Sequence, residues 1–150
     1  MGIQRFAPDA STPGGWARSA TVTVHRVGAD GAVSAPTPFA ELFLGNARYG
    51  RARLGNLDHG AEGMVGDRDG RLFVATRLGV QVFDPGGRLL GVVTLPALPL
   101  ERNPKRPLSC TFGGSGMATL YVTCGDRVYA VETRTAGVPL PELWPRDPAE

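Results

Sequence analysis

Closely spaced glycines and prolines constrain the fold of this chain more than any other feature. The longest stretch without either residue is the twelve residues from Trp16 to Val27. Glycine and proline are the two weakest helix formers, and a membrane-spanning helix needs about 20 apolar residues. The spacing therefore excludes coiled coils, bundles of long helices and transmembrane helices. Because 42% of the residues are hydrophobic, we expect a packed core built from short elements, and the pattern favours strands.

The charge balance argues against a polyanionic or membrane partner. Sixteen Lys and Arg residues against fourteen Asp and Glu residues give a net charge of +2. The densest basic cluster, Arg48, Arg51 and Arg53 around Tyr49, lacks a nucleic-acid-binding motif and is interpreted as a solvated loop. The polar segment Met1–Gly15 does not resemble a signal peptide. We therefore predict a cytoplasmic protein with no nucleic-acid partner and no membrane partner.

The second half of the chain alternates short β-branched and aromatic runs with tight-turn signals such as Asp67–Gly70 and Asp84–Gly87. Upstream, a strand is predicted over Thr21–Val27 and is followed by the turn Gly28–Gly31, while Phe39–Leu44 is compatible with a strand or a short helix. The other predicted strands are Gly63–Val65, Arg71–Thr76, Gly79–Phe83, Arg88–Leu95, Cys110–Gly114, Thr119–Thr123 and Asp126–Glu132. The connection from Pro96 to Pro107 is too rich in proline to add to a ladder.

One sequence offset aligns two of these hairpins. A shift of 48 residues sets Leu72–Thr76 on Leu120–Cys124, and it also sets Val80 on Val128. A third, partial copy is visible upstream, where residues 24–33 resemble residues 80–89. A repeat of about 40–50 residues with four short strands is typical of a β-propeller blade. A β-sandwich or meander with similar hairpins is the alternative.

Several motifs resemble the gluconolactonase superfamily, which includes senescence marker protein and luciferin-regenerating enzyme. The resemblance is strong over residues 61–139 and faint over residues 20–42. Its fifth-blade motifs are Glu62–Thr76 and Gly79–Gly91, its sixth-blade motifs are Ser109–Gly114 and Thr119–Cys124, and its C-terminal motif is Thr135–Pro139.

The resemblance implies a six-bladed propeller that hydrolyses sugar lactones or related cyclic esters with a divalent cation, commonly calcium, at the mouth of its central channel. One family ligand is the Asp of an Asp-Gly-Met or Asp-Gly-Leu motif that opens the fifth blade. This chain has Glu62, Gly63 and Met64 there, so its carboxylate is one methylene longer. The resemblance thus implies that Glu62 is a metal ligand and a candidate catalytic base for a lactone substrate.

Other candidate site residues have weaker support. The family's first-blade Glu and middle-blade Asn ligands have no counterpart in this sequence. Asp58 and His59 lie in a glycine-bounded loop without a third spaced ligand and are interpreted as surface residues. His25 lies in a predicted strand, and Ser109 has no histidine partner evident in the sequence, so neither is expected to be catalytic.

Length limits the number of blades. Six blades of about 45 residues need about 270 residues, whereas these 150 residues hold about two and a half to three. Three interpretations remain: a C-terminal piece of a longer protein, a half-propeller that forms a homodimer, or a small open stack. The unpatterned first residues favour the first. The predicted domains are a loose arm (1–19), a partial propeller (20–139) and a Pro-rich tail (140–150).

Two functional hypotheses follow. The first is a gluconolactonase-like, metal-dependent lactone hydrolase with an incomplete site. The second is a non-catalytic propeller segment that acts as a binding or self-assembling module. The two cysteines, Cys110 and Cys124, are expected on opposite faces of adjacent strands, which excludes a disulfide between them.

Overall fold

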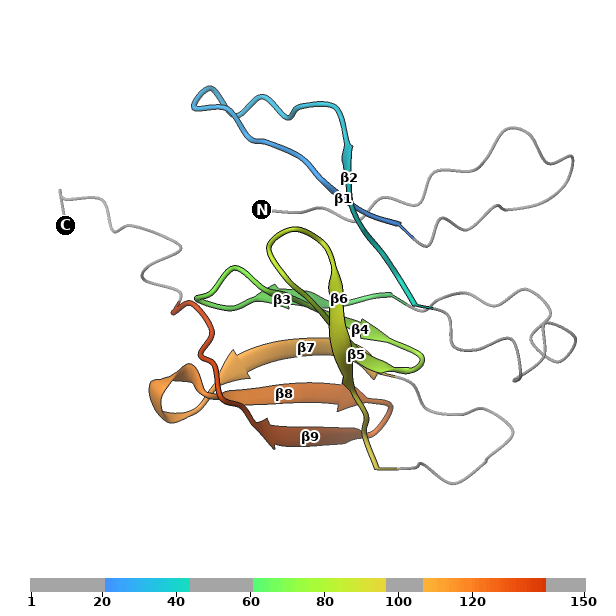
Figure 1. Cartoon of the computed structure of the whole chain (residues 1–150). Coiled ribbons are helices and arrows are strands. Elements are labelled where there is room, and N and C mark those ends of the chain that lie inside the picture. Colours follow the sequence, from blue (N-terminus) through green and yellow to red (C-terminus); the bar gives the residue numbers. More distant parts are fainter. Residues whose placement is uncertain (1–20, 44–60, 97–106, 140–150) are drawn as a thin grey trace, which may run out of the picture.

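Three antiparallel sheets make up the fold (Figure 1). The computed structural model describes residues 21–43, 61–96 and 107–139. The strands are β1 (Thr21–Val24), β2 (Thr37–Glu41), β3 (Met64–Gly66), β4 (Leu72–Thr76), β5 (Gly79–Phe83), β6 (Leu89–Val93), β7 (Pro107–Gly113), β8 (Thr119–Cys124) and β9 (Arg127–Glu132). A short 3-10 helix, η2 (Ser115–Met117), lies between β7 and β8. The predicted all-β class is confirmed.

The sheets are meanders in which each strand pairs with its neighbours in sequence. Their orders are β1-β2, β3-β4-β5-β6 and β7-β8-β9, so the middle sheet has the four strands of the predicted blade. Of the segment Phe39–Leu44, which is compatible with a strand or a short helix, the first three residues belong to strand β2, residues 42 and 43 follow the strand, and residue 44 lies outside the described residues. The prediction for the proline-rich connection is wrong at its last residue, because Pro107 starts β7 and pairs with Cys124. Proline is tolerated at the first residue of a strand.

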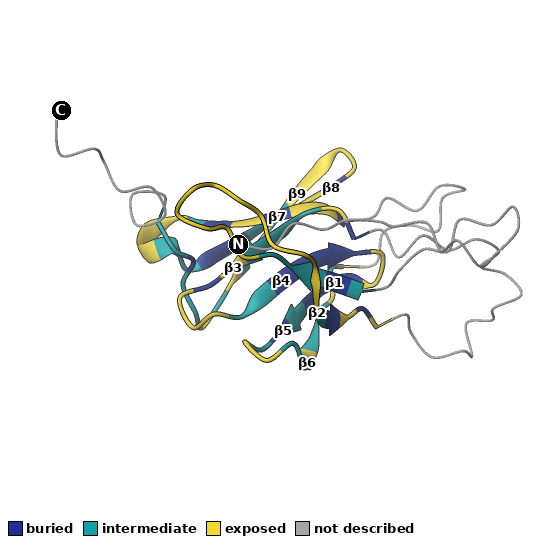
Figure 2. Ribbon diagram, turned by 90° about the horizontal axis from the view of Figure 1, so that it is seen from above, coloured by how far each residue is buried: buried dark blue, intermediate teal, exposed yellow. Residues whose placement is uncertain are grey.

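Two apolar clusters hold the three sheets together. One joins the middle sheet to β7–β9 and includes Phe73, Val80, Phe112 and Leu120. The rings of Phe73 and Phe112 meet edge to face with centroids 5.1 Å apart. The other joins the β1-β2 pair to the opposite face of the middle sheet. The middle sheet is therefore packed on both faces, whereas the hairpin that follows β1 and the tip between β8 and β9 are largely exposed (Figure 2).

Two hairpins have the same register at positions 48 residues apart. Leu72 of β4 pairs with Phe83 of β5, and Leu120 of β8 pairs with Val131 of β9. The inner strands β3 and β7 precede these hairpins in the same way. Residues that share a repeat position therefore lie on the same face of their sheets.

Aspartates close two of the tight turns in the same way. The Oδ1 of Asp84 accepts hydrogen bonds from the N–H groups of Gly86 (3.0 Å) and Arg88 (2.9 Å). These bonds, with that from Arg88 N–H the strongest influence, lower the pKa of the Asp84 carboxyl. Asp67 makes the equivalent bonds to the N–H groups of Asp69 (3.0 Å) and Arg71 (2.8 Å). Both predicted turns therefore have an acceptor side chain that fixes the backbone.

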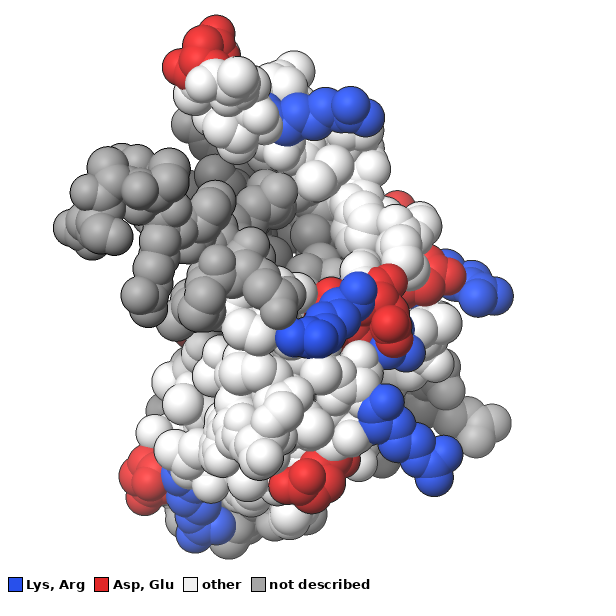
Figure 3. Space-filling model, turned by 90° about the vertical axis from the view of Figure 1, so that its left-hand side faces the viewer, with Lys and Arg blue, Asp and Glu red and all other residues white. Residues whose placement is uncertain are grey.

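Asp67 also binds the segment that follows β9. Its Oδ2 accepts hydrogen bonds from Arg71 Nε (2.7 Å) and from Thr135 Oγ1 (2.9 Å), and Asp67 forms a β-bridge with Gly137. The Asp67 side chain is 0% exposed. Its hydrogen bond raises the pKa of the Arg71 guanidinium. On the side of the molecule where this turn lies, acidic and basic side chains are interspersed (Figure 3).

Both cysteines are buried, and neither forms a disulfide. Cys110 pairs with Val122, and Cys124 follows Val122 by two residues on the same strand. The expectation of opposite faces is therefore wrong, because alternation along β8 places both thiols on one face. Burial raises the pKa of the Cys110 thiol to about 12, so this thiol stays protonated at neutral pH.

Several predicted features lie outside the described residues. They are the arm 1–19, the tail 140–150, the basic cluster at residues 48–53, and Asp58 and His59. No helix in the described ranges is long and apolar enough to cross a membrane.

Candidate functional site

The Glu62 candidate lies at the start of the innermost strand of the middle sheet. Ala61, directly before it, is 2% exposed, whereas Glu62 itself is exposed. The N–H of Glu62 donates to the carbonyl of Ala75 (3.3 Å), and the N–H of Ala75 donates to the carbonyl of Gly63 (2.9 Å). Glu62 and Gly63 thus stand together opposite the single residue Ala75, and this arrangement is a β-bulge. A bulge redirects a side chain at the end of a ladder, and here that side chain is Glu62.

Gly63 brings the first strands of two sheets into direct contact. A Cβ atom at Gly63 would lie 2.5 Å from Ser109 Cα and 2.7 Å from Ser109 Oγ. Ser109 is an exposed residue of β7. The close approach therefore places the Ser109 hydroxyl beside the Glu62–Gly63 bulge, a contact that no sequence pattern predicted.

Replacing Gly63 by alanine is expected to lower the free energy of unfolding by about 1–3 kcal/mol, because the new methyl group overlaps the Ser109 backbone. Gly66→Ala, three residues later in β3, is the matched control, since a Cβ there meets nothing closer than 3.9 Å. Urea unfolding of both variants measures the difference. Equal stability of the two variants would contradict the close approach of β3 and β7.

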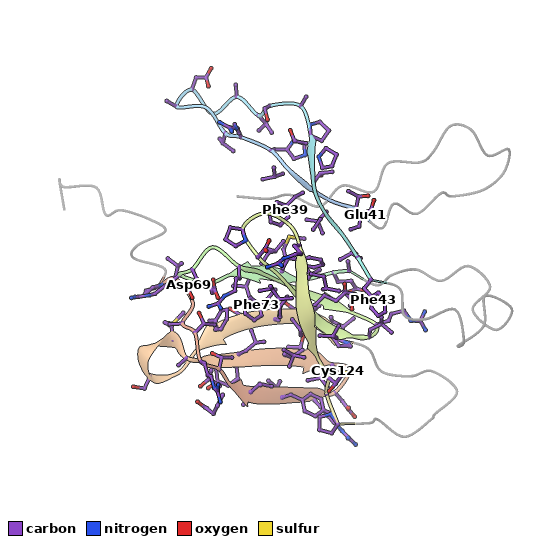
Figure 4. All side chains as sticks on the ribbon, in the orientation of Figure 1. Phe39, Glu41, Phe43, Asp69, Phe73 and Cys124 are labelled. Carbon is purple, nitrogen blue, oxygen red and sulfur yellow. The ribbon has the colours of Figure 1, made fainter. Side chains whose placement is uncertain are left out.

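The buried Gln81 amide fixes the chain where it leaves the first sheet. Its Oε1 accepts from Phe43 N–H and its Nε2 donates to the Phe43 carbonyl, both at 2.8 Å. Nε2 also donates to Thr76 Oγ1 (3.2 Å). Phe43 and Asp69 lie toward opposite ends of the middle sheet (Figure 4). Gln81 therefore anchors the chain that leaves the β1-β2 pair on the side of the middle sheet where the β4-β5 turn lies. Gln81 and Phe43 are 38 residues apart, and no sequence pattern predicted their contact.

His25 is another sequence candidate among the described residues, and it lies in the hairpin that follows β1. His25 is half-buried, and its Nδ1 lies 2.8 Å from the Ser34 carbonyl oxygen, which agrees with a packing role rather than a catalytic one. In the part of the chain that the structure describes, no three His, Cys, Asp or Glu side chains are grouped to hold a metal ion. Calcium takes about 6–8 oxygen ligands. Glu62 can therefore supply one carboxylate ligand to a hard cation such as calcium. The described acids do not complete a calcium site around it.

Comparison with known proteins places these features in a family. The family model for the SMP-30/gluconolactonase/LRE-like region matches residues 18–126, which include Glu62, Gly63 and Ser109. The chain belongs to this family. A curated gluconolactonase from Zymomonas mobilis subsp. mobilis is 36% identical to it over 77 residues, which is 51% of this chain and 19% of that protein. The family inferred from the sequence motifs is therefore confirmed.

Solved structures of the family show the same fold. A luciferin-regenerating enzyme aligns with a TM-score of 0.57 at 20% identity, over 82% of this chain and 42% of that one. A gluconolactonase from Xanthomonas campestris aligns with a TM-score of 0.52 at 26% identity, over 81% of this chain and 31% of that one. The chain therefore spans less than half of each of these relatives, and its sheets correspond to part of a propeller.

Proposed function

We propose that this member of the family is a gluconolactonase-like hydrolase of sugar lactones or related cyclic esters, and that a divalent cation, calcium, assists the reaction at the Glu62 end of β3. The observation that carries the proposal is the exposed Glu62–Gly63 bulge at the start of an inner strand. It stands where the family motif has an acid, and it contacts the first strand of the next sheet through Ser109.

The proposed chemistry needs few groups. Water adds to the lactone carbonyl carbon, the ring C–O bond breaks, and the ring oxygen takes up a proton to give the hydroxy acid. A bound cation would polarise the carbonyl oxygen. The Glu62 carboxylate can ligate such a cation, or it can accept the proton of the attacking water. The exposed Ser109 hydroxyl, which lies against Gly63, would supply a hydrogen bond to a lactone oxygen.

A second function is supported by the limited acid content of the site. Glu62 replaces an aspartate, and among the described residues no group of three or more His, Cys, Asp or Glu side chains could hold a metal ion. A non-catalytic propeller segment that acts as a binding module would keep the sheets and their contacts without a complete ligand set. This alternative predicts the same fold and no lactone hydrolysis.

Hydrolysis of gluconolactone with and without added calcium distinguishes the two functions. We expect calcium-dependent activity that falls by at least about tenfold in Glu62→Gln, because the amide is a poorer ligand and cannot act as a base. Glu41→Gln, an exposed glutamate on β2, is the matched control and should leave the rate unchanged. Activity that is equal in Glu62→Gln and the parent protein would rule out the assigned role of Glu62.

A further inference from the structure

Each internal contact between sheets joins two different kinds of face. The face of the middle sheet that contains Val80 packs on β7–β9, where Val131 contributes to the contact. The opposite face of the middle sheet, which contains Phe83, packs on the β1-β2 pair. Val131 is the repeat equivalent of Phe83, 48 residues later. We call a sheet face Phe83-type or Val80-type when it carries that residue or its repeat equivalent. In this molecule, a Phe83-type face packs against a Val80-type face.

The last sheet carries a Val80-type face that no described segment covers. We call it face A, and its residues are Tyr121, Thr123, Val128 and Ala130. These residues follow Phe73, Ala75, Val80 and Val82 by 48 positions, and those four lie in the packed cluster. Val80 is 0% exposed, whereas Val128 is 66% exposed. Face A thus repeats a packing surface but is largely open to solvent, since only Tyr121 of its four residues is half-buried and the other three are exposed.

The first sheet carries an open Phe83-type face. We call it face B, and its residues are His25, Val27 and Val33. Val27 and Val33 form a β-bridge, and Phe83 and Leu89, 56 positions later, are paired in the same way. Phe83 is 0% exposed, whereas Val27 and Val33 are 57% and 56% exposed.

The turns of these two hairpins confirm the equivalence. Gly31 N–H donates to the Gly28 carbonyl, and Gly87 N–H donates to the Asp84 carbonyl, both at 2.9 Å. The φ angles of Gly31 and Gly87 are 80° and 83°, a left-handed conformation that favours glycine. The β1-β2 hairpin is therefore a copy of the β5-β6 hairpin, and its residues can be assigned to faces position by position.

We propose that a second copy of this chain docks through these surfaces, with face A of each copy on face B of the other. The chain itself carries both complementary surfaces. The residues named for face A and face B are uncharged, in keeping with the depletion of charge at interface centres, and Glu132, the next residue of this face along β9, lies at its edge, where it accepts a hydrogen bond from Thr119 Oγ1. Two such contacts related by a twofold axis close the pair and leave neither face open. Since β3 and β7 begin on the same side of the molecule, the pair places both Glu62 side chains at one end.

The mass of the full chain in solution tests the pairing, by light scattering at micromolar concentrations. We expect a dimer for the parent protein and monomers for Val128→Lys and for Val27→Glu, because each substitution buries an unpaired charge in both contacts. Mixing the two variants should restore a dimer, in which one contact is the parent contact and the other pairs Lys with Glu. Leu78→Lys, in the β4-β5 turn and 42% exposed, is the control and should remain dimeric.

Two results would overturn the pairing: a monomeric parent protein, or a dimer that persists in both single variants. Restoration by mixing separates loss of the interface from misfolding of a variant. Mass does not depend on lactone hydrolysis, so the proposed function and the proposed pairing can fail independently.

Discussion

Phe83→Ala is expected to lower the free energy of unfolding by about 3–5 kcal/mol. Phe83 is 0% exposed and is the largest fully buried side chain among the described residues. It lies in the cluster with Val22, Ala40 and Val74 that joins the β1-β2 pair to the middle sheet. Alanine leaves a cavity between two sheets, and neither sheet can close it without breaking its contacts elsewhere.

Urea unfolding of Phe83→Ala measures this loss. Leu78→Ala is the control, because Leu78 is 42% exposed in a turn and its truncation should change stability by no more than about 0.5 kcal/mol. If both variants lose the same small amount, the β1-β2 pair does not pack on the middle sheet as described.

Asp67→Ala is expected to lower the free energy of unfolding by about 2–4 kcal/mol, because several hydrogen-bond donors lose a charged acceptor at once. These donors are the N–H groups of Asp69 and Arg71, the Arg71 guanidinium and the Thr135 hydroxyl. The segment around Thr135 is held further by Arg68 N–H to the Ala136 carbonyl and Gly137 N–H to the Met117 carbonyl, both at 2.9 Å. Asp67 therefore ties the middle sheet to the chain beyond β9.

The matched control is Asp84→Ala. Asp84 caps its turn with the same backbone bonds, but its side chain is 23% exposed and no described contact ties it to a second sheet. We expect a smaller loss of stability than in Asp67→Ala. Hydrogen exchange at Gly137 should accelerate only in Asp67→Ala, and unchanged exchange there would contradict the role of Asp67 in holding this segment.

Local sequence patterns predicted the hairpins well because their determinants are local. Alternating apolar residues and turns such as Asp84–Gly87 specify a strand, its reversal and the next strand without reference to the rest of the chain. The 48-residue offset also predicted which hairpins share a register. The position of Glu62 at the start of an inner strand followed from the same patterns and the family motif.

Contacts between distant positions could not be predicted in this way. Thr135 binds Asp67 from 68 residues away, and Gln81 binds the backbone of Phe43. Phe43 takes part through its backbone, which every residue supplies, and a threonine hydroxyl and an aspartate carboxylate each suit many partners, so neither pair carries a sequence signal. The bulge at Glu62 and the contact of Gly63 with Ser109 also arise from packing between sheets. These are the features that determine the shape of the candidate site.

The central claim of this account is that the Glu62 end of β3 binds the cation used in lactone hydrolysis. Calorimetric titration of the full chain with calcium tests it most directly, with Glu62→Gln and the control Glu41→Gln measured under the same conditions. We predict saturable calcium binding by the parent protein and by Glu41→Gln, and its loss in Glu62→Gln. No detectable binding by the parent protein, or equal binding by Glu62→Gln, would contradict the claim.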